Sequence, residues 1–408
     1  MSFNGINETA GKRTIYMDNA ATTRMSPAAV QAMLPYFDSV FGNPSSLHLA
    51  GQKAAEALAD ARARLANCIG AAPGEITFTS GGTESDNQAI VSCARIGEKN
   101  GKKHIVSTAF EHHAVLHTLK KLEREGFEIT LLDVGEAGLV RPEQVRDAIR
   151  PDTCLVTVMY ANNEIGTVQP VAEIGKICRA AGVPFHTDAV QAAGHLPIDV
   201  VSQNIDLLSL SAHKFHGPKG IGLLYVRKGI RLSNILEGGA QERGKRPGTE
   251  NVPAIMGMAA ALTEACGRIE ENKARMTALR NRLMEGMSAI PHAVLNGDAE
   301  QRLPGNVSFC FEGIEGESLL LLLDDKGVCA SSGSACTSGS LDPSHVLLAI
   351  GRPHEIAHGS LRLTLSEENT EEEIDYTVRA VREAVDLLRN ISPVWRDLVS
   401  GKKSFLTK

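Results

Sequence analysis

Short apolar or β-branched runs alternate with longer amphipathic segments from about residue 50 to residue 390. This alternation limits the possible folds, because parallel strands need crossover connections of a dozen or more residues, which are usually helices. We interpret the short runs as strands at 75–79, 104–108, 154–159, 183–187, 206–210 and 221–226, and the longer segments as helices near 84–97, 113–125 and 170–181. The pattern predicts an α/β fold with a mostly parallel, doubly wound sheet flanked by helices.

The pattern changes after Pro253. An Ala-, Met- and Leu-rich segment over about 256–290 predicts a long helix that leaves the first unit. A final helix is expected to begin after Thr370, because Thr370 and Glu373 form a capping box and the following apolar residues share one face. Further strands are predicted at 306–311, 328–330 and 360–365. We expect a large domain of residues 18–262 and a smaller α/β C-terminal domain made of 1–17 and 263–408.

Charge, hydropathy and cysteine use exclude several classes of protein. Of 408 residues, 42 are Lys or Arg and 48 are Asp or Glu, and no basic block stands out, so nucleic acid is not expected as a partner. The longest leucine run, 319–323, falls far short of the ~18–20 apolar residues of a membrane span. The N-terminal segment resembles neither a secretory signal nor a transit helix, and the eight cysteines include no Cys-x-x-Cys pair. These features predict a cytoplasmic protein without a disulfide framework.

Three motifs follow predicted strands, at the sheet edge where α/β proteins bind ligands. Ser80-Gly81-Gly82-Thr83 leads into a helix, and glycines at a helix start let backbone N–H groups approach a phosphate. Asp188 and Gln191 follow the fourth predicted strand, where a carboxylate could keep a heterocyclic nitrogen protonated. Lys214 follows the fifth with Ser211 and His213, and burial there would lower the pKa of its amine and suit it to binding an aldehyde.

Each motif alone has an ordinary alternative: a plain βα turn, a solvated aspartate that caps a helix, or an exposed lysine. Together they favour one cofactor. Pyridoxal phosphate (PLP) needs a phosphate cradle, an acidic partner for its pyridinium nitrogen and a lysine for its aldehyde.

Eight segments in order resemble the NifS/IscS cysteine desulfurases, which are class V aminotransferase-like enzymes of the fold type I PLP group. The resemblance covers about residues 16–395 and rests on SGGTESDN, EHHAVL, YANNEIGTVQP, HTDAVQ, SAHKFHGPKG, ERGKRPGTEN, SSGSACTSG and HGSLRL. It implies a homodimeric enzyme that converts L-cysteine to L-alanine. Within the family, SGSLDPSH and RNISPVW look closer to NifS, the nitrogen-fixation member, than to the housekeeping IscS.

The resemblance also implies roles for individual residues. Lys214 would bind the cofactor aldehyde, Asp188 the pyridinium nitrogen and Gln191 the ring hydroxyl oxygen. His112 would stack on the ring and move protons. The residues implied to hold the phosphate are Gly82, Thr83, Ser211 and His213, with Thr249 added from the neighbouring subunit.

Two further residues are implied on the substrate side of the site. Asn163 would contact both cofactor and substrate. Arg362 would bind the substrate carboxylate, because a guanidinium group can hold a carboxylate with two hydrogen bonds. An arginine paired with a structural aspartate remains the alternative for Arg362.

Cys336 lies in a Gly/Ser-rich segment, 330–341, whose composition predicts a flexible loop suited to a nucleophile. The resemblance implies that its thiolate attacks the substrate sulfur and becomes a persulfide, which would supply iron–sulfur cluster assembly. His112 or the cofactor could generate the thiolate, since a free thiol has a pKa of about 8.5. Cys329 is expected to be buried, or alternatively to resolve the persulfide. A U-type scaffold protein is the expected partner, with Cys336 as a possible transient iron–sulfur ligand.

Other functions stay open at this point. One alternative is another PLP enzyme, such as a selenocysteine lyase or a transaminase, that would not use Cys336. A non-catalytic sulfur carrier is a second. A zinc hydrolase is a third, because His354, Glu355 and His358 fit the His-Glu-x-x-His pattern. Pro353 and Gly359 bracket that motif so closely that its helix would barely exceed one turn.

Overall fold

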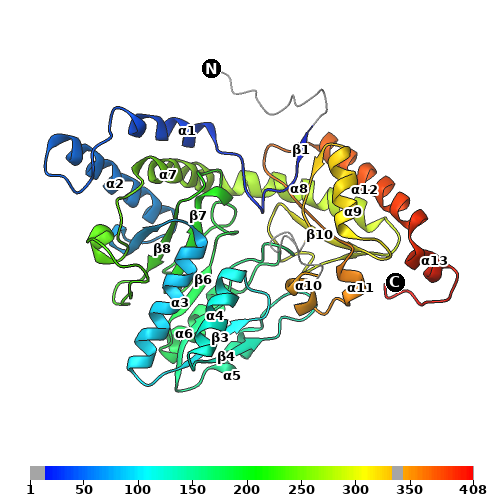
Figure 1. Cartoon of the computed structure of the whole chain (residues 1–408), viewed down its shortest axis with the longest axis horizontal. Coiled ribbons are helices and arrows are strands. Elements are labelled where there is room, and N and C mark those ends of the chain that lie inside the picture. The colour runs from blue at the N-terminus through cyan, green and yellow to red at the C-terminus, as the bar shows by residue number, and fades with distance from the viewer. Residues whose placement is uncertain (1–13, 333–342, 408) are drawn as a thin grey trace.

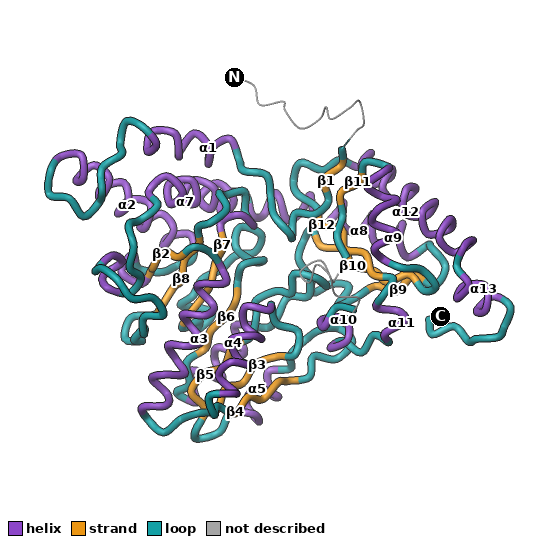
Figure 2. Tube along the Cα trace, viewed as in Figure 1, coloured by secondary structure: helices purple, strands orange, loops and turns teal. Residues whose placement is uncertain are grey.

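The computed structural model describes residues 14–332 and 343–407. Its largest element is a seven-stranded sheet in the order β2-β8-β7-β6-β5-β3-β4 (Figures 1 and 2). The strands are β2 (Ile76–Thr79), β3 (His104–Thr108), β4 (Glu128–Leu132), β5 (Thr153–Thr157), β6 (Phe185–Asp188), β7 (Leu207–Ser211) and β8 (Gly222–Val226). Strands β3 to β7 are parallel, and β8 runs antiparallel to both β2 and β7.

The six strands predicted in this region are confirmed with small shifts at their ends, whereas β4 was not predicted. Strand β4 lies at the edge of the sheet and pairs only with β3 among the described strands. Four of its five residues are partly or fully exposed, so it lacks the continuous apolar run that marks its buried neighbours. An edge strand of this kind gives a weak signal in a single sequence.

Helices cover both faces of the large sheet because neighbouring residues of each buried strand point to opposite sides. Ile105 packs with α3 (Gly82–Lys99) and α4 (His113–Arg124) on one face. Val106 belongs to the cluster on the other face. That second cluster includes residues of α1 (Pro27–Met33), α2 (Leu49–Cys68), α5 (Pro142–Ala148), α6 (Val171–Ala181) and α7 (Val252–Gly267). The core of the large unit is therefore a sheet between two helical layers.

A second unit contains a three-stranded antiparallel sheet, β12-β10-β9, and the short parallel pair β1-β11. These strands are β1 (Ile15–Tyr16), β9 (Ala293–Leu295), β10 (Asn306–Phe311), β11 (Val328–Cys329) and β12 (Ser360–Thr364). The helices of this unit are α8 (Ile269–Ser288), α9 (Gly316–Asp325), α10 (His345–Ala349), α11 (His354–Ala357), α12 (Glu371–Ile391) and α13 (Pro393–Val399). Ile15 and Met17 share its hydrophobic cluster with residues after position 278. The domain limits 18–262 and 1–17 with 263–408 stay a prediction.

The long helix predicted over 256–290 is wrong in one respect, because the chain bends and forms two helices. Helix α7 ends at Gly267 and α8 begins at Ile269, with Arg268 between them outside helical geometry. Glycine is a poor helix former, which explains a break at this point. The capping box that starts α12 is confirmed, since the Thr370 side chain accepts from the Glu373 N–H. Among the residues that the structure describes, no helix is long and apolar enough to span a membrane.

An ion pair links the loop after Lys214 to the segment after β12. The Nε2 atom of His216 lies 3.4 Å from a carboxylate oxygen of Glu367. Burial disfavours the charged ring, but the hydrogen bond and charge of Glu367 outweigh it and raise the pKa of His216. The hydrogen bond from His216 lowers the pKa of Glu367 to about 2 despite its burial.

We expect Glu367→Gln to destabilise the protein by about 1 kcal/mol, most strongly between pH 4.5 and 6.5. The contribution of His216 is complete below its unfolded pKa near 6.5 and is lost as pH rises through the higher folded value. The contribution of Glu367 is complete above its unfolded pKa near 4.5 and is lost as pH falls toward 2. Urea unfolding at about pH 5.5 and about pH 9 should show the larger loss at the lower pH.

Glu383→Gln is the matched control for this measurement. Glu383 pairs with Lys326 at 2.6 Å, and its side chain is 64% exposed. Both partners stay charged between the two pH values, so the effect of this change should be small and equal at each. A similar loss for Glu367→Gln at both pH values would contradict the assignment.

Candidate active site

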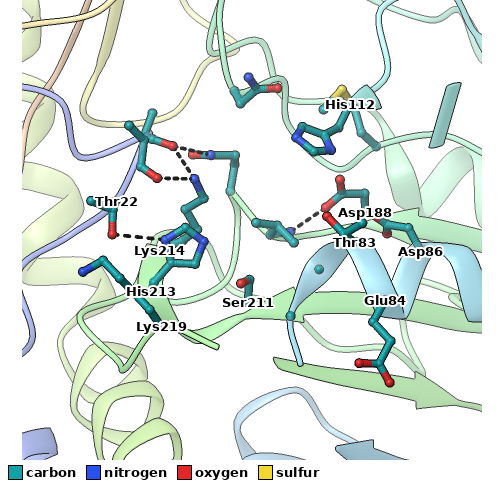
Figure 3. Close-up of a pocket in the computed structure, with 18 of the residues that line it drawn as sticks. Thr22, Thr83, Glu84, Asp86, His112, Asp188, Ser211, His213, Lys214 and Lys219 are labelled. Carbon is teal, nitrogen blue, oxygen red and sulfur yellow. Dashed lines mark hydrogen bonds between the residues drawn. The ribbon is translucent and has the colours of Figure 1, made fainter. Parts of the chain in front are cut away.

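A cavity of about 570 Å³ lies at the carboxyl ends of β6 and β7, beside the first turn of α3 (Figure 3). Every residue that we predicted for the cofactor and substrate lines it, except Thr249 and Cys336. These lining residues are Gly82, Thr83, His112, Asn163, Asp188, Gln191, Ser211, His213, Lys214 and Arg362. The fold therefore brings together side chains that are far apart in the sequence.

One end of the cavity has the character of a phosphate site. Helix α3 begins at Gly82, and a Cβ atom there would lie 2.7 Å from Val190 Cγ2, so the backbone passes this point closely. Ser211 and Thr83 add hydroxyl groups, and Lys219 adds a positive charge. The N-terminus of a helix, with its unpaired N–H groups, favours an anion here.

His213 lies at the same end, where its Nδ1 atom is 3.1 Å from the hydroxyl of Thr22 (Figure 3). Burial first, then the charges of Lys214 and Lys219, lower the pKa of His213 to about 4. The ring is therefore neutral at pH 7 and acts through hydrogen bonds.

Lys214 stands on the turn that follows β7, the 3₁₀ helix Ala212–Lys214. Its Nζ atom donates to the carbonyl oxygens of Ala20 at 2.6 Å and Ala21 at 2.7 Å. Figure 3 shows these bonds on the side of the cavity away from Asp188 and Asp86. The amine and the carboxylate thus face the cavity from different walls. This arrangement suits a ring that carries an aldehyde at one position and a basic nitrogen at another.

Asp188 ends β6, and its carboxylate accepts the N–H of Val190 at 2.9 Å. Burial raises the pKa of Asp188 to about 6, although the Val190 N–H and the charge of Lys214 oppose the rise. Asp86 is completely buried beside it, and its pKa is well above the usual range because of burial and the charge of Asp188. One oxygen of Asp86, Oδ1, has no hydrogen-bond partner within the described residues.

These carboxyl groups fit a protonated ring nitrogen better than a metal ion. Ligand atoms of Asp86, His112 and Asp188 lie within 4.8 Å of one another. Burial and the charge of Asp188 raise the pKa of Asp86 well above its usual range, so a single negative charge on Asp188 is favoured over charges on both carboxyl groups. A single buried anion matches the single positive charge of a pyridinium nitrogen.

His112 caps α4, and its Nδ1 atom accepts the N–H of Ala114 at 3.1 Å. Burial, and then the charge of Lys214, lowers the pKa of His112 to about 4. The ring is neutral at pH 7, and because Nδ1 accepts a hydrogen bond, its proton is on Nε2. His112 is therefore arranged to donate a hydrogen bond at Nε2.

Arg362 combines features of both interpretations of its role. Its Nη2 atom lies 3.0 Å from Asp18 Oδ1, which is the aspartate pairing of the alternative. Its Nη1 atom donates to the carbonyl oxygen of Asn163 at 3.1 Å, and the residue lines the cavity. The buried Nε atom has no partner among the described residues. The guanidinium thus retains donor capacity at the cavity wall.

Cys336 lies outside the described residues, but both ends of the segment that contains it are placed. Before it, Ser331 pairs with Arg362 through two backbone hydrogen bonds of 3.2 and 2.6 Å. After it, the His345 ring lies 2.9 Å from the carbonyl oxygen of Glu111, next to His112. Both ends are therefore anchored beside cavity residues. Cys329, expected to be buried, is only partly so in β11, and burial raises the pKa of its thiol.

The zinc-hydrolase alternative finds little support in the geometry. His354 and His358 have ring centroids 4.5 Å apart, but their helix, α11, has only four residues. Across residues 14–332 and 343–407, Asp86, His112 and Asp188 form the one potential metal-ligand cluster, and it includes neither histidine. No third ligand therefore joins His354 and His358 in the described part of the chain.

Thr22, Asp86 and Lys219 also line the cavity and were not predicted. Lys219 and Asp86 lie within the motifs SAHKFHGPKG and SGGTESDN, so proximity to Lys214 and Gly82 was a usable signal. Thr22 gave no such signal, because the sequence around it indicates neither a strand nor a helix. Its hydroxyl lies against the ring of His213, which is 191 positions later in the chain.

Comparison with known proteins assigns the chain to a family. The aminotransferase class-V family matches residues 15–377. A cysteine desulfurase IscS from Methanosarcina thermophila is 54% identical over 390 residues, which cover 96% of each chain. One from Clostridium botulinum strain Hall is 51% identical over 394 residues, covering 96% of this chain and 99% of its own.

A solved structure of a NifS-like protein has a TM-score of 0.86 at 38% identity and covers 92% of this chain and 100% of its own. The fold type I assignment is confirmed by this likeness. The protein therefore belongs to the aminotransferase class-V family and, within it, to the PLP-dependent cysteine desulfurases.

Proposed function

We propose that this cysteine desulfurase transfers the sulfur of L-cysteine to Cys336 as a persulfide, and that the persulfide supplies iron–sulfur cluster assembly. The observation that carries the proposal is the anchoring of the segment around Cys336. Ser331 on one side is bonded to Arg362, and His345 on the other contacts the carbonyl oxygen next to His112. Thirteen residues, 332–344, lie between these anchors, and Cys336 is among them.

The cavity residues divide the work on the cofactor. When bound, PLP supplies an electron sink that stabilises negative charge at the Cα atom of the substrate. Lys214 would hold its aldehyde, and Asp188 would keep its ring nitrogen protonated. Gln191 would contact the ring hydroxyl oxygen from a side chain whose Nε2 donates to Ala20 O at 3.0 Å. The phosphate would lie against Gly82, Thr83, Ser211 and His213.

The substrate side of the site is formed by Arg362, Asn163 and His112. The guanidinium of Arg362 would bind the α-carboxylate, with Asp18 and the carbonyl oxygen of Asn163 fixing its plane. The neutral ring of His112 would stack on the cofactor and carry protons. Its Nε2–H can donate a proton during the reaction, and the ring must then be reprotonated before the next turnover.

We also propose a homodimer in which Thr249 completes the site of the neighbouring subunit. Thr249 does not line the large cavity of its own chain. It lines a separate hollow of about 180 Å³ with Ser80, Gly220 and Arg246. A run of apolar side chains close in sequence is strongly exposed, which suits a surface that a second copy covers. Its members are Leu34, Phe37, Phe41, Leu47 and Leu49.

The cellular setting extends this proposal. A U-type scaffold would receive sulfur from Cys336, which could transiently ligate an iron–sulfur cluster during the transfer. The segments SGSLDPSH and RNISPVW favour a nitrogen-fixation role, whereas the name IscS of the relatives favours general cluster assembly. We place the enzyme in the cytoplasm, with no nucleic acid or membrane as partner.

The test of the function is the product ratio from L-cysteine. Purified PLP-loaded protein with a thiol reductant is expected to form L-alanine and sulfide in equal amounts, as measured together in one reaction. A selenocysteine lyase would instead act on L-selenocysteine and leave L-cysteine unchanged. A transaminase would consume a keto acid and release no sulfide. Either of these two results would contradict the proposal.

A further inference from the structure

Two cysteines outside the active site lie against each other where α2 and α7 end. Cys68 is the last residue of α2, and Cys266 is the last but one of α7. The Cys266 sulfur lies 3.9 Å from the carbonyl oxygen of Cys68, which places the two residues in direct contact. Both residues are partly exposed, unlike the cysteines of the core.

The groups around this pair stabilise a thiolate on Cys68. The hydrogen bond from Cys266, together with Thr263 and the charge of Arg64, lowers the pKa of Cys68 to about 7 against the effect of burial. Arg64 is held nearby, since its Nη2 atom donates to the Thr263 hydroxyl at 3.3 Å. The negative end of each helix dipole opposes an anion here. The pKa of Cys68 is lowered despite this opposing effect.

Cys93 and Cys154 form a contrasting pair within the same chain. Burial first, and then the charge of Cys154, raises the pKa of Cys93, and burial raises the pKa of Cys154 to about 11. Both residues are buried in the core. Their thiols are protonated at pH 7 and shielded from solution. Neighbouring cysteines alone therefore do not make a reactive pair in this protein.

We propose that Cys68 and Cys266 form a redox-active dithiol that small-molecule disulfides convert to a disulfide bond between α2 and α7. The Cys68 thiolate attacks one sulfur of the small disulfide, forms a mixed disulfide and releases one thiolate. Cys266 then loses its proton to solvent and attacks the Cys68 sulfur, which releases the second thiolate. In the balance, two protein thiols lose two electrons and two protons, and the small disulfide is reduced to two thiols.

The disulfide would link the C-terminal ends of α2 and α7. Helices α2 and α7 pack on the same face of the large sheet. Helix α7 ends one residue after Cys266 and, through Arg268, leads into α8 of the second unit. A bond between residues 68 and 266 therefore ties the end of α2 to the point where the chain passes from one unit to the other.

The experiment treats the reduced, full-length, PLP-loaded protein with oxidised glutathione, then maps all cysteines by mass spectrometry without reduction. We expect a cross-linked peptide pair that contains Cys68 and Cys266 and lacks two hydrogens. In Cys266→Ser, the glutathione adduct should remain on Cys68. Cys93 and Cys154 serve as the internal control and should react at least about tenfold more slowly than Cys68.

Two further measurements separate a reactive dithiol from a merely exposed thiol. Arg64→Gln should slow the reaction of Cys68 several-fold while leaving Cys93 unchanged. Oxidised wild type should unfold at a higher temperature than reduced wild type, and this difference should vanish in Cys68→Ser. A Cys68–Cys266 peptide that never forms, or an adduct that forms equally fast on Cys93, would overturn the proposal. Desulfurase activity is not the readout, so the result is independent of the role proposed for Cys336.

Discussion

Cys336→Ala is expected to reduce the formation of L-alanine and sulfide from L-cysteine by about 10³-fold or more, while the cofactor stays bound. The thiolate of Cys336 is the proposed nucleophile that attacks the substrate sulfur, so without it no persulfide forms and the carbon–sulfur bond is not cleaved. Residues that hold the cofactor are unchanged, so its visible absorbance should match that of wild type. Product formation and the spectrum are measured on the same sample.

Cys329→Ala is the matched control, because Cys329 lies seven residues earlier in β11. Burial, with the charges of Asp324 and Asp18, raises the pKa of its thiol, so it is a poor nucleophile at neutral pH. This variant should keep nearly full activity. If Cys336→Ala is as active as wild type, the persulfide proposal fails and a lyase that needs no cysteine becomes the better description.

The elements that a single sequence predicts well here are those buried on both faces. Strands β5 and β7 are fully buried, and they appear in the sequence as continuous apolar or β-branched runs. Strand β4 escaped prediction because it lies at the sheet edge. The break at Arg268 was missed because an apolar, alanine-rich segment indicates a helix without indicating where the helix bends.

The site was predictable where a motif follows a strand directly, as with Asp188 after β6 and Lys214 after β7. The contacts that hold Asp188 and Lys214 in place were not predictable from the sequence. Lys214 bonds to the carbonyl oxygens of Ala20 and Ala21, which lie almost 200 positions earlier in an irregular segment. Asp86 in a sequence resembles any acid in the first turns of a helix, and only its buried position beside Asp188 shows that its pKa is raised. Long-range contacts of this kind have no local signature.

Lys214→Ala is expected to reduce desulfuration by at least about 10³-fold and to remove the covalent attachment of the cofactor. Lys214 is the lysine at the wall of the cavity opposite Asp188, held by two backbone carbonyl oxygens within 2.7 Å. Borohydride treatment followed by peptide mapping should label Lys214 in wild type and leave the variant unlabelled. Lys219→Ala is the control, since Lys219 lines the same cavity but would only support the phosphate. Labelling at Lys219 instead would contradict the assignment.

The Lys214 variant also tests whether Thr249 acts across subunits. In a mixed dimer of Lys214→Ala and Thr249→Ala chains, one site lacks the lysine. The other keeps its lysine and receives an intact Thr249 from its partner. Equal mixing with free exchange gives half mixed dimers with one complete site each, so about a quarter of wild-type activity should return. If Thr249 served its own chain, the surviving lysine would stand in a site without Thr249. Mixing would then restore nothing beyond the activity of the Thr249→Ala chains alone.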